Sequence, residues 1–97
     1  MIYDIQFSSK AQKFLKKIND KNLKIKFKNA FEEIKNDPYI GDPKVGDLSG
    51  IYCYDIHYNK TNYEIAYTIH ETPKGMVVVI MVGTRENFYD ELKRYIN

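Results

Sequence analysis

Three runs of residues with strand character in the second half of the chain constrain the fold more than any other feature. They cover residues 51–58, 63–71 and 76–82. The polar segment 59–62 between the first two is typical of a β-hairpin turn. The third run follows a second turn, residues 72–75, and its β-branched, apolar composition favours a central strand covered on both faces. We therefore predict an antiparallel meander of three strands.

The first half of the chain predicts one strand followed by two helices. Residues 2–7 show the alternation of a short strand, and Ser8 can cap a helix that starts just after it. Apolar residues then recur at helical spacing over residues 11–18 and again over residues 23–34. The second helix has to end before Pro38, because the residue that precedes a proline avoids the α region. The two helices form an antiparallel hairpin.

The whole pattern predicts an α+β fold. Apolar positions in residues 87–96 add a short C-terminal helix, so the order is strand, helical hairpin, three-strand meander, helix. We expect two layers, with the helical hairpin covering one face of the sheet. A chain of 97 residues has room for one core, so we predict a single domain over residues 1–97.

The pattern also predicts which residues face one another in the hairpin. If residues 59–62 form the turn, Tyr58 faces Tyr63, and the aromatic and aliphatic residues of both strands share the face that the helices cover. Most of the nine tyrosines then belong to the core rather than to a base-stacking surface. The opposite face is polar and pairs His57 with Glu64. We expect this second face to be open to a substrate or partner.

The charge is unevenly distributed, although the formal net charge is only +2. Residues 10–28 contain eight lysines and one acidic residue, whereas the second half has five basic and six acidic residues. One interpretation is a solvated helix surface. The other is a surface that binds RNA phosphates without reading sequence. The lysines assigned to that surface are Lys10, Lys13, Lys17, Lys24 and Lys28.

Cysteine content and hydropathy indicate where the protein acts. A single cysteine, Cys53, excludes an internal disulfide and a cysteine-based zinc site. It has no sequence feature of a reactive thiol, and we expect it to be half-buried. No 18-residue apolar run is present, and residues 1–5 lack the basic and apolar regions of a signal sequence, so we expect none. We expect a soluble cytoplasmic protein with no membrane contact, no cofactor and no metal.

Several short motifs, taken with the element order, resemble those of the RelE/ParE superfamily, the small toxins of type II toxin-antitoxin modules. These motifs are Asp37-Pro38, Leu48-Ser49-Gly50, Val82-Gly83-Thr84-Arg85 and the following Phe88-Tyr89. The resemblance implies a cognate antitoxin protein as partner. It also implies one of two activities: RelE-like members cut mRNA on the ribosome, whereas ParE-like members inhibit DNA gyrase and have no nuclease activity. A toxin fold that retains only antitoxin binding is a third possibility.

The resemblance assigns roles to particular residues. Arg85 matches the arginine after the last strand, and Tyr89 matches the tyrosine of the following segment. RelE-like members also carry basic residues at the positions of Asp55, His57 and Glu64, where this chain has only one residue that can be cationic. Some branches of the superfamily use a carboxylate and a histidine there instead.

Metal-independent RNA cleavage needs a base for the 2′-hydroxyl proton, a cation for the phosphorane and an acid for the departing 5′-oxygen. His57 and Glu64, if opposite one another, form an acid/base pair in which the carboxylate orients the imidazole. Arg85 holds the phosphate, and Tyr89 protonates the leaving group or stacks on a base. Simpler interpretations of the same residues stand beside this one. His57 and Glu64 form an ordinary exposed pair, Arg85 pairs with Glu64 or caps a helix, and Tyr89 packs in the core.

Overall fold

The computed structural model describes residues 2–97 and confirms the α+β fold. One mixed sheet has the strand order β1-β5-β4-β3-β2, in which β1 runs parallel to β5 and the other pairs are antiparallel. The strands are β1 (Asp4–Phe7), β2 (Asp42–Pro43), β3 (Tyr52–Tyr58), β4 (Thr61–His70) and β5 (Met76–Thr84). The helices are α1 (Ser9–Lys16), α2 (Lys21–Asn36) and α3 (Phe88–Ile96), with short 3₁₀ turns η1 (Pro38–Ile40) and η2 (Gly46–Leu48).

The helical hairpin begins and ends as its capping residues require. The Ser8 side chain accepts a hydrogen bond from the Ala11 amide at 3.0 Å, and Asp20 does the same for the first turn of α2. Asp37 closes α2 immediately before Pro38. No helix within residues 2–97 combines the length and apolar character that a membrane span needs.

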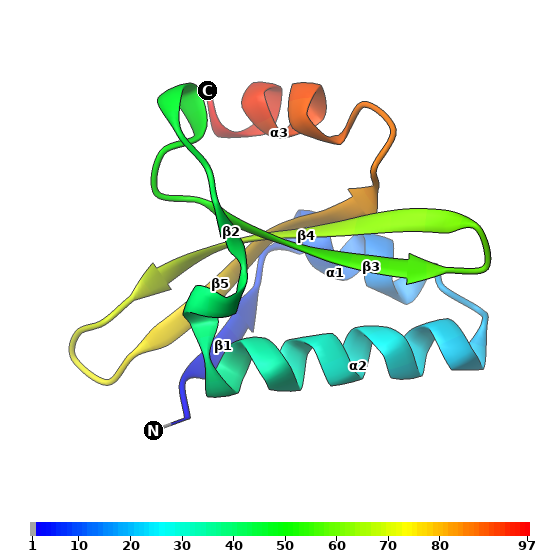
Figure 1. Cartoon of the computed structure of the whole chain (residues 1–97), viewed down its shortest axis with the longest axis horizontal. Coiled ribbons are helices and arrows are strands. Elements are labelled where there is room, and N and C mark those ends of the chain that lie inside the picture. Colours follow the sequence, from blue (N-terminus) through cyan, green and yellow to red (C-terminus); the bar gives the residue numbers. More distant parts are fainter. Residues whose placement is uncertain (1) are drawn as a thin grey trace.

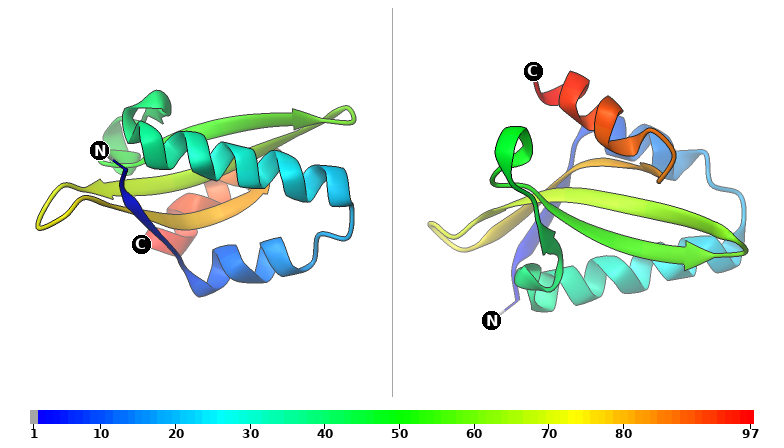
Figure 2. Two further views of the ribbon diagram at one scale, coloured as in Figure 1. Left: turned by 90° about the horizontal axis from the view of Figure 1, so that it is seen from below. Right: turned by 45° about the horizontal axis from the view of Figure 1, so that its top comes forward.

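The sheet is covered on both faces, although unequally (Figures 1 and 2). The hairpin of α1 and α2 covers one face, as predicted. On the other face, α3 and the segment before β3 bury a second, smaller cluster of side chains, in which Phe88 and Leu92 meet Cys53 and Met81. The second face is therefore only partly open, and Cys53 is buried rather than half-buried, with 3% of its surface exposed. The amphipathic pattern predicted α3 but not the face against which it packs.

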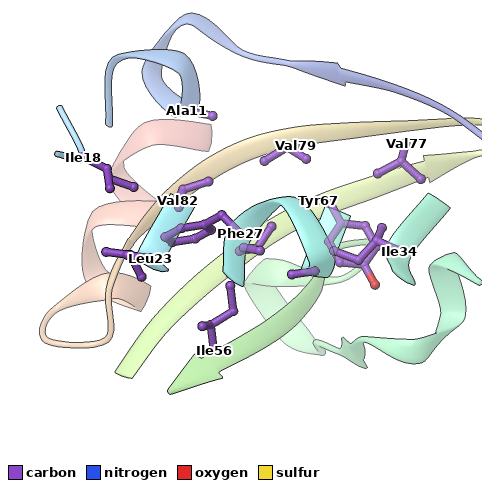
Figure 3. Close-up of a cluster of buried hydrophobic side chains, with 12 residues drawn as sticks. Ala11, Ile18, Leu23, Phe27, Ile34, Ile56, Tyr67, Val77, Val79 and Val82 are labelled. Atoms are coloured by element: carbon purple, nitrogen blue, oxygen red, sulfur yellow. The ribbon is translucent and has the colours of Figure 1, made fainter. Parts of the chain in front are cut away.

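The main core lies between the sheet and the helical hairpin (Figure 3). Phe27 and Ile34 of α2 pack there with Ile56 and Tyr67 of the meander. The Tyr67 hydroxyl donates to the Pro38 carbonyl at 2.6 Å and accepts from the Gly41 amide at 3.1 Å, so its polar end is satisfied inside the core. The prediction that most tyrosines contribute to packing is confirmed for those of β3 and β4.

The predicted hairpin register is wrong by two residues. Asn59 and Lys60 both have positive φ, 52° and 67°, and make a tight two-residue turn. Tyr58 therefore pairs with Thr61, not with Tyr63. Asparagine enters this left-handed region readily, whereas lysine does so rarely, which is why the sequence favoured a longer turn. Because the shift is even, every residue keeps its predicted face and only its partner changes.

Candidate functional site

The candidate site lies at the end of the sheet where β4 and β5 meet the first turn of α3. Glu64 of β4 is flanked by Asp55 of β3 and by Gly83 of β5. A Cβ atom at Gly83 would be 3.5 Å from the Phe88 ring, an ordinary van der Waals distance, which shows how closely the start of α3 packs on the end of β5. The close packing brings the residues around the start of α3 over the Glu64 side chain.

Arg85 and Tyr89 both contact the Glu64 carboxylate. The Tyr89 hydroxyl donates to Glu64 Oε1 at 3.2 Å, and Arg85 Nε lies 3.5 Å from Glu64 Oε2. The Glu64 side chain is 0% exposed, whereas that of Arg85 is 58% exposed. Within residues 2–97, Glu64 Oε2 has no hydrogen-bond partner. The site thus joins a buried acid, a phenol and a largely exposed guanidinium.

The pKa of Glu64 is raised to about 7, first by burial and then by the neighbouring Asp55 carboxyl, while Tyr89 and Arg85 act in the opposite direction. A buried carboxylate that lacks full hydrogen bonding is costly, so it spends part of its time protonated near neutral pH. Such a group can both accept and donate a proton. A carboxyl perturbed in this way at a partly open surface is a candidate for a functional residue.

The Tyr89 side chain is held from two sides. Its ring is half-buried and meets the Phe88 ring edge to face, with 5.6 Å between centroids. The Lys44 Nζ lies 4.9 Å from the centroid of the Tyr89 ring. Burial is the main cause that raises the pKa of the Tyr89 phenol, and Lys44 opposes it. Lys44 was missed in the sequence because it lies in an irregular segment, where no periodic pattern links it to Tyr89.

His57 is not opposite Glu64, so the predicted acid/base pair is wrong as a cross-strand pair. His57 faces Asn62, and its Nδ1 lies 2.7 Å from Asn62 Oδ1. The residue opposite Glu64 is Asp55, which is exposed. His57 lies two residues beyond Asp55 along the same strand, on the same face and nearer the hairpin turn. It is exposed there and free to meet a bound molecule.

The predicted lysine surface divides into two parts. Lys10 and Lys13 of α1, with Lys17 directly after it, line a hollow whose opposite wall includes Gly83 and Thr84 at the end of β5. The remaining two, Lys24 and Lys28 of α2, border a separate and mostly apolar groove beside β1. The first group therefore lies next to the strand end that leads into Arg85.

The other reactive groups of the chain offer little chemistry of their own. Burial raises the pKa of the Cys53 thiol to about 12, so it is not a nucleophile at neutral pH. No group of three or more His, Cys, Asp or Glu side chains in residues 2–97 is arranged to hold a metal ion. The reactive groups of the site are thus the carboxyl, phenol, imidazole and cationic side chains already described.

A family model for the ParE-like toxins of type II bacterial toxin-antitoxin systems matches residues 5–93. The chain belongs to this family. No curated protein sequence matches it.

Solved structures that resemble the chain are toxins of such systems. An arginine-substituted mutant of the Escherichia coli toxin RelE in the free state is 24% identical, covers 97% of this chain and 98% of its own, and gives a TM-score of 0.72. A RelBE toxin-antitoxin complex from Mycobacterium tuberculosis is 23% identical, with 88% and 100% covered and a TM-score of 0.72. The intact E. coli RelBE complex is 23% identical, with 84% and 94% covered and a TM-score of 0.66. At these identities the likeness concerns the fold.

Proposed function

We propose that this toxin is a metal-independent endoribonuclease that cuts mRNA on the ribosome and so stops translation and growth. The observation that carries the proposal is the buried Glu64 carboxylate, which contacts the Tyr89 hydroxyl and the Arg85 guanidinium at once. These three groups supply a base, an acid and a phosphate-binding cation, the functions that attack by a 2′-hydroxyl requires.

The proposed roles follow from the chemistry of each group. Glu64, with its pKa raised to about 7 by burial, takes the proton of the 2′-hydroxyl as that oxygen attacks phosphorus. Arg85 neutralises the phosphorane with its fixed charge. Tyr89 gives its hydroxyl proton to the departing 5′-oxygen. The products are a 2′,3′-cyclic phosphate and a 5′-hydroxyl end.

Arg85 can serve the phosphate because its contact with Glu64 is loose. The distance of 3.5 Å and the 58% exposure of the arginine side chain leave the guanidinium open to an anion that approaches from solvent. A phosphate accepts two parallel hydrogen bonds from arginine, which the present contact with Glu64 does not provide. When Arg85 binds the phosphate instead of Glu64, the carboxylate is no longer next to a cation. Its pKa then rises, and Glu64 becomes a stronger base.

The remaining predicted residues surround this centre. His57, exposed on the same face, is the second acid/base candidate and is within reach of a nucleotide rather than of Glu64. Lys10, Lys13 and Lys17 border the hollow beside Thr84 and would bind the RNA backbone or ribosomal RNA. Lys24 and Lys28 lie on the other groove and fit a different partner.

The partner proposed for that other groove is a cognate antitoxin. Two of the similar solved structures are toxin-antitoxin complexes. Ile5, Phe7 and Phe31 line the groove and lysines border it, so it suits an amphipathic segment with acidic residues that folds on binding. The proposed action on ribosomes implies that the toxin works in the cytoplasm.

Induced expression of the wild type and of Arg85→Ala tests the proposed activity. We expect the wild type to halt protein synthesis and to leave mRNA cut within the ribosome, and Arg85→Ala to restore growth. Glu86→Ala, which changes an exposed neighbour, is the matched control and should remain toxic. A folded wild-type protein with no effect on growth would instead indicate a toxin that retains only antitoxin binding.

A second candidate function is inhibition of DNA gyrase without nuclease activity. The hairpin favours it, because the exposed Asp55 and the buried Glu64 stand where RelE-like members carry cations. An exposed carboxylate in place of a cation repels RNA phosphates. Filamentation and a DNA-damage response with intact mRNA, together with inhibited supercoiling by purified gyrase, would replace the nuclease proposal with this one.

A further inference from the structure

Lys44 is a cation that the proposed chemistry has not yet used. Its Nζ lies 4.9 Å from the centroid of the Tyr89 ring and 2.9 Å from Asp42 Oδ2. The Lys44 side chain is only 22% exposed, which is unusual for a lysine in a surface segment. Hydrogen bonding to Asp42 raises the pKa of Lys44 and keeps it charged. The cation is therefore both fixed and partly withdrawn from water.

The backbone of Lys44 is fixed to the sheet. Asp42 and Pro43 pair with Cys53 and Tyr52 at the start of β3, and the Lys44 amide donates to the Ile51 carbonyl at 2.9 Å. The lysine thus continues the edge of the sheet, from which its side chain crosses toward α3. This short pairing is the element that brings a residue far from α3 in sequence to the Tyr89 ring.

We propose that Lys44 is a positioning residue that holds the Tyr89 ring and stabilises the phenolate formed when Tyr89 gives up its proton. The proposal rests on the proposed function, in which Tyr89 protonates the departing 5′-oxygen. The phenol proton moves to that oxygen, and the negative charge left on Tyr89 is met by the ammonium of Lys44. Arg85 remains with the phosphate, so each developing charge has its own cation.

The charged and titratable groups around Tyr89 explain why a cation is needed there. Burial raises the pKa of the phenol, and so do the Cys53 thiol and the Glu64 carboxylate. The nearby ammonium of Lys44 lowers the pKa of the phenol. Lys93 of α3 lines the same hollow as Lys44, and Arg85 contacts the Glu64 carboxylate that accepts from Tyr89. A less basic phenol is a better acid for a leaving group near neutral pH.

A purely structural interpretation of Lys44 makes a different prediction. If Lys44 served only to pair with Asp42 and hold the segment before η2, its removal would lower stability and leave the ionisation of Tyr89 unchanged. The acidity of Tyr89 is therefore the property to measure, and it can be measured without RNA or ribosomes.

The experiment is a pH titration of protein labelled with ¹³C at the tyrosine ζ carbon, followed by NMR, with the Tyr89 signal assigned by its absence from Tyr89→Phe. We expect Lys44→Met to shift the titration of Tyr89 upward, and Lys44→Arg to keep it near that of the wild type. Lys74→Met, which removes one lysine at the opposite end of β5, is the matched control for net charge and should shift nothing. An unshifted Tyr89 titration in folded Lys44→Met would overturn the proposal.

Cleavage assays separate this proposal from the nuclease proposal on which it rests. If the wild type cuts mRNA on ribosomes, Lys44→Met should cut roughly five- to thirtyfold more slowly, the range for a partly desolvated cation at an aromatic ring. Lys44→Arg should recover most of that loss. If the titration shifts as expected but the wild type cuts no RNA, the nuclease proposal fails and the contact between Lys44 and Tyr89 stands. If the wild type cuts RNA and Lys44→Met cuts equally fast, the positioning role fails.

Discussion

Tyrosine hydroxyls donate to carboxylates on both faces of the sheet, but the carboxylates are exposed on the helix face and buried on the α3 face. We assign the first kind of contact to stability and the second to the proposed function. On the helix face, the Tyr58 hydroxyl donates to Asp20 Oδ2 at 2.9 Å and the Tyr54 hydroxyl donates to Glu33 Oε2 at 2.5 Å. Both acids belong to the start or the body of α2 and are exposed. On the α3 face, Tyr89 donates to Glu64, which is fully buried.

The pKa shifts have opposite signs in the two settings. The hydrogen bond from Tyr58 is the main cause that lowers the pKa of Asp20, whereas burial raises the pKa of Glu64 to about 7. The first contact stabilises the carboxylate and attaches α2 to β3. The second leaves an acid partly unsatisfied inside the protein, which costs stability. The protein thus keeps a destabilising, partly unsatisfied carboxyl at Glu64 but not on the helix face. This difference is expected if Glu64 serves the proposed cleavage.

The largest expected effect concerns the two tyrosine hydroxyls themselves. Tyr89→Phe should slow ribosome-dependent cleavage by roughly 10² to 10⁴, the usual contribution of a general acid. Tyr54→Phe removes a hydroxyl on the helix face and should leave the rate unchanged. Single-turnover cleavage of an mRNA on purified ribosomes provides the measurement. Equal rates for both variants would remove the distinction between the faces.

The buried Tyr67 hydroxyl, which both donates and accepts a hydrogen bond, should contribute to stability but not to cleavage. Tyr67→Phe leaves the Pro38 carbonyl and the Gly41 amide without their partner inside the core. We expect the free energy of unfolding to fall by about 1–3 kcal/mol. Urea denaturation measures the loss, and the cleavage rate per folded molecule should stay the same. A change in cleavage as large as that of Tyr89→Phe would contradict this division of roles.

The pH dependence of stability should differ between the buried acid, Glu64, and the exposed acid, Asp20. The pKa of Glu64 is raised from 4.5 to about 7 in the folded protein, so its contribution to stability is full below the unfolded value and is lost as pH rises toward 7. Relative to Glu64→Gln, the wild type should therefore weaken as pH rises through this window. Thermal unfolding at several pH values tests it. The same slope in both proteins would show that the Glu64 carboxyl is not perturbed.

The smallest effect is expected for the exposed hydrogen bond between Tyr58 and Asp20. Tyr58→Phe should lower stability slightly at neutral pH, because the lowered pKa of Asp20 reflects a carboxylate that the fold stabilises. The sign is opposite to that of Glu64: the difference between wild type and variant should shrink as pH falls below 3.8, where the unfolded carboxyl is also protonated. Denaturation at pH 7 and at pH 3 gives the comparison. A difference that grows in acid would be inconsistent with this contact.

Much of the fold followed from periodicity in the sequence. Helical spacing predicted α1 and α2, and β-branched runs predicted the meander, since each of these elements buries a regular stripe of side chains. The parallel pairing of β1 with β5 and the packing of α3 on the second face could not be predicted in the same way. Both depend on contacts between segments far apart in the chain, which local patterns do not encode.

The site could be predicted only for residues that lie on, or directly after, regular helices and strands. Arg85 and Tyr89 follow β5, and Glu64 points to the expected face, so these three were brought together. The pairing of His57 with Glu64 failed because one residue, Lys60, adopts a backbone conformation that lysine seldom takes. The part played by Lys44 depends on the short pairing of β2 with β3, for which two residues give too little pattern.

The central claim is that Glu64, the carboxylate on the α3 face, takes part in RNA cleavage, whereas Glu33, a carboxylate on the helix face, does not. The most direct test compares wild type, Glu64→Gln and Glu33→Gln on purified ribosomes that hold a defined mRNA, with the cleaved ends identified chemically. We predict that the wild type and Glu33→Gln produce 2′,3′-cyclic phosphate and 5′-hydroxyl ends at equal rates, and that Glu64→Gln is slower by roughly 10² or more. Cleavage by Glu64→Gln at the wild-type rate would contradict the claim.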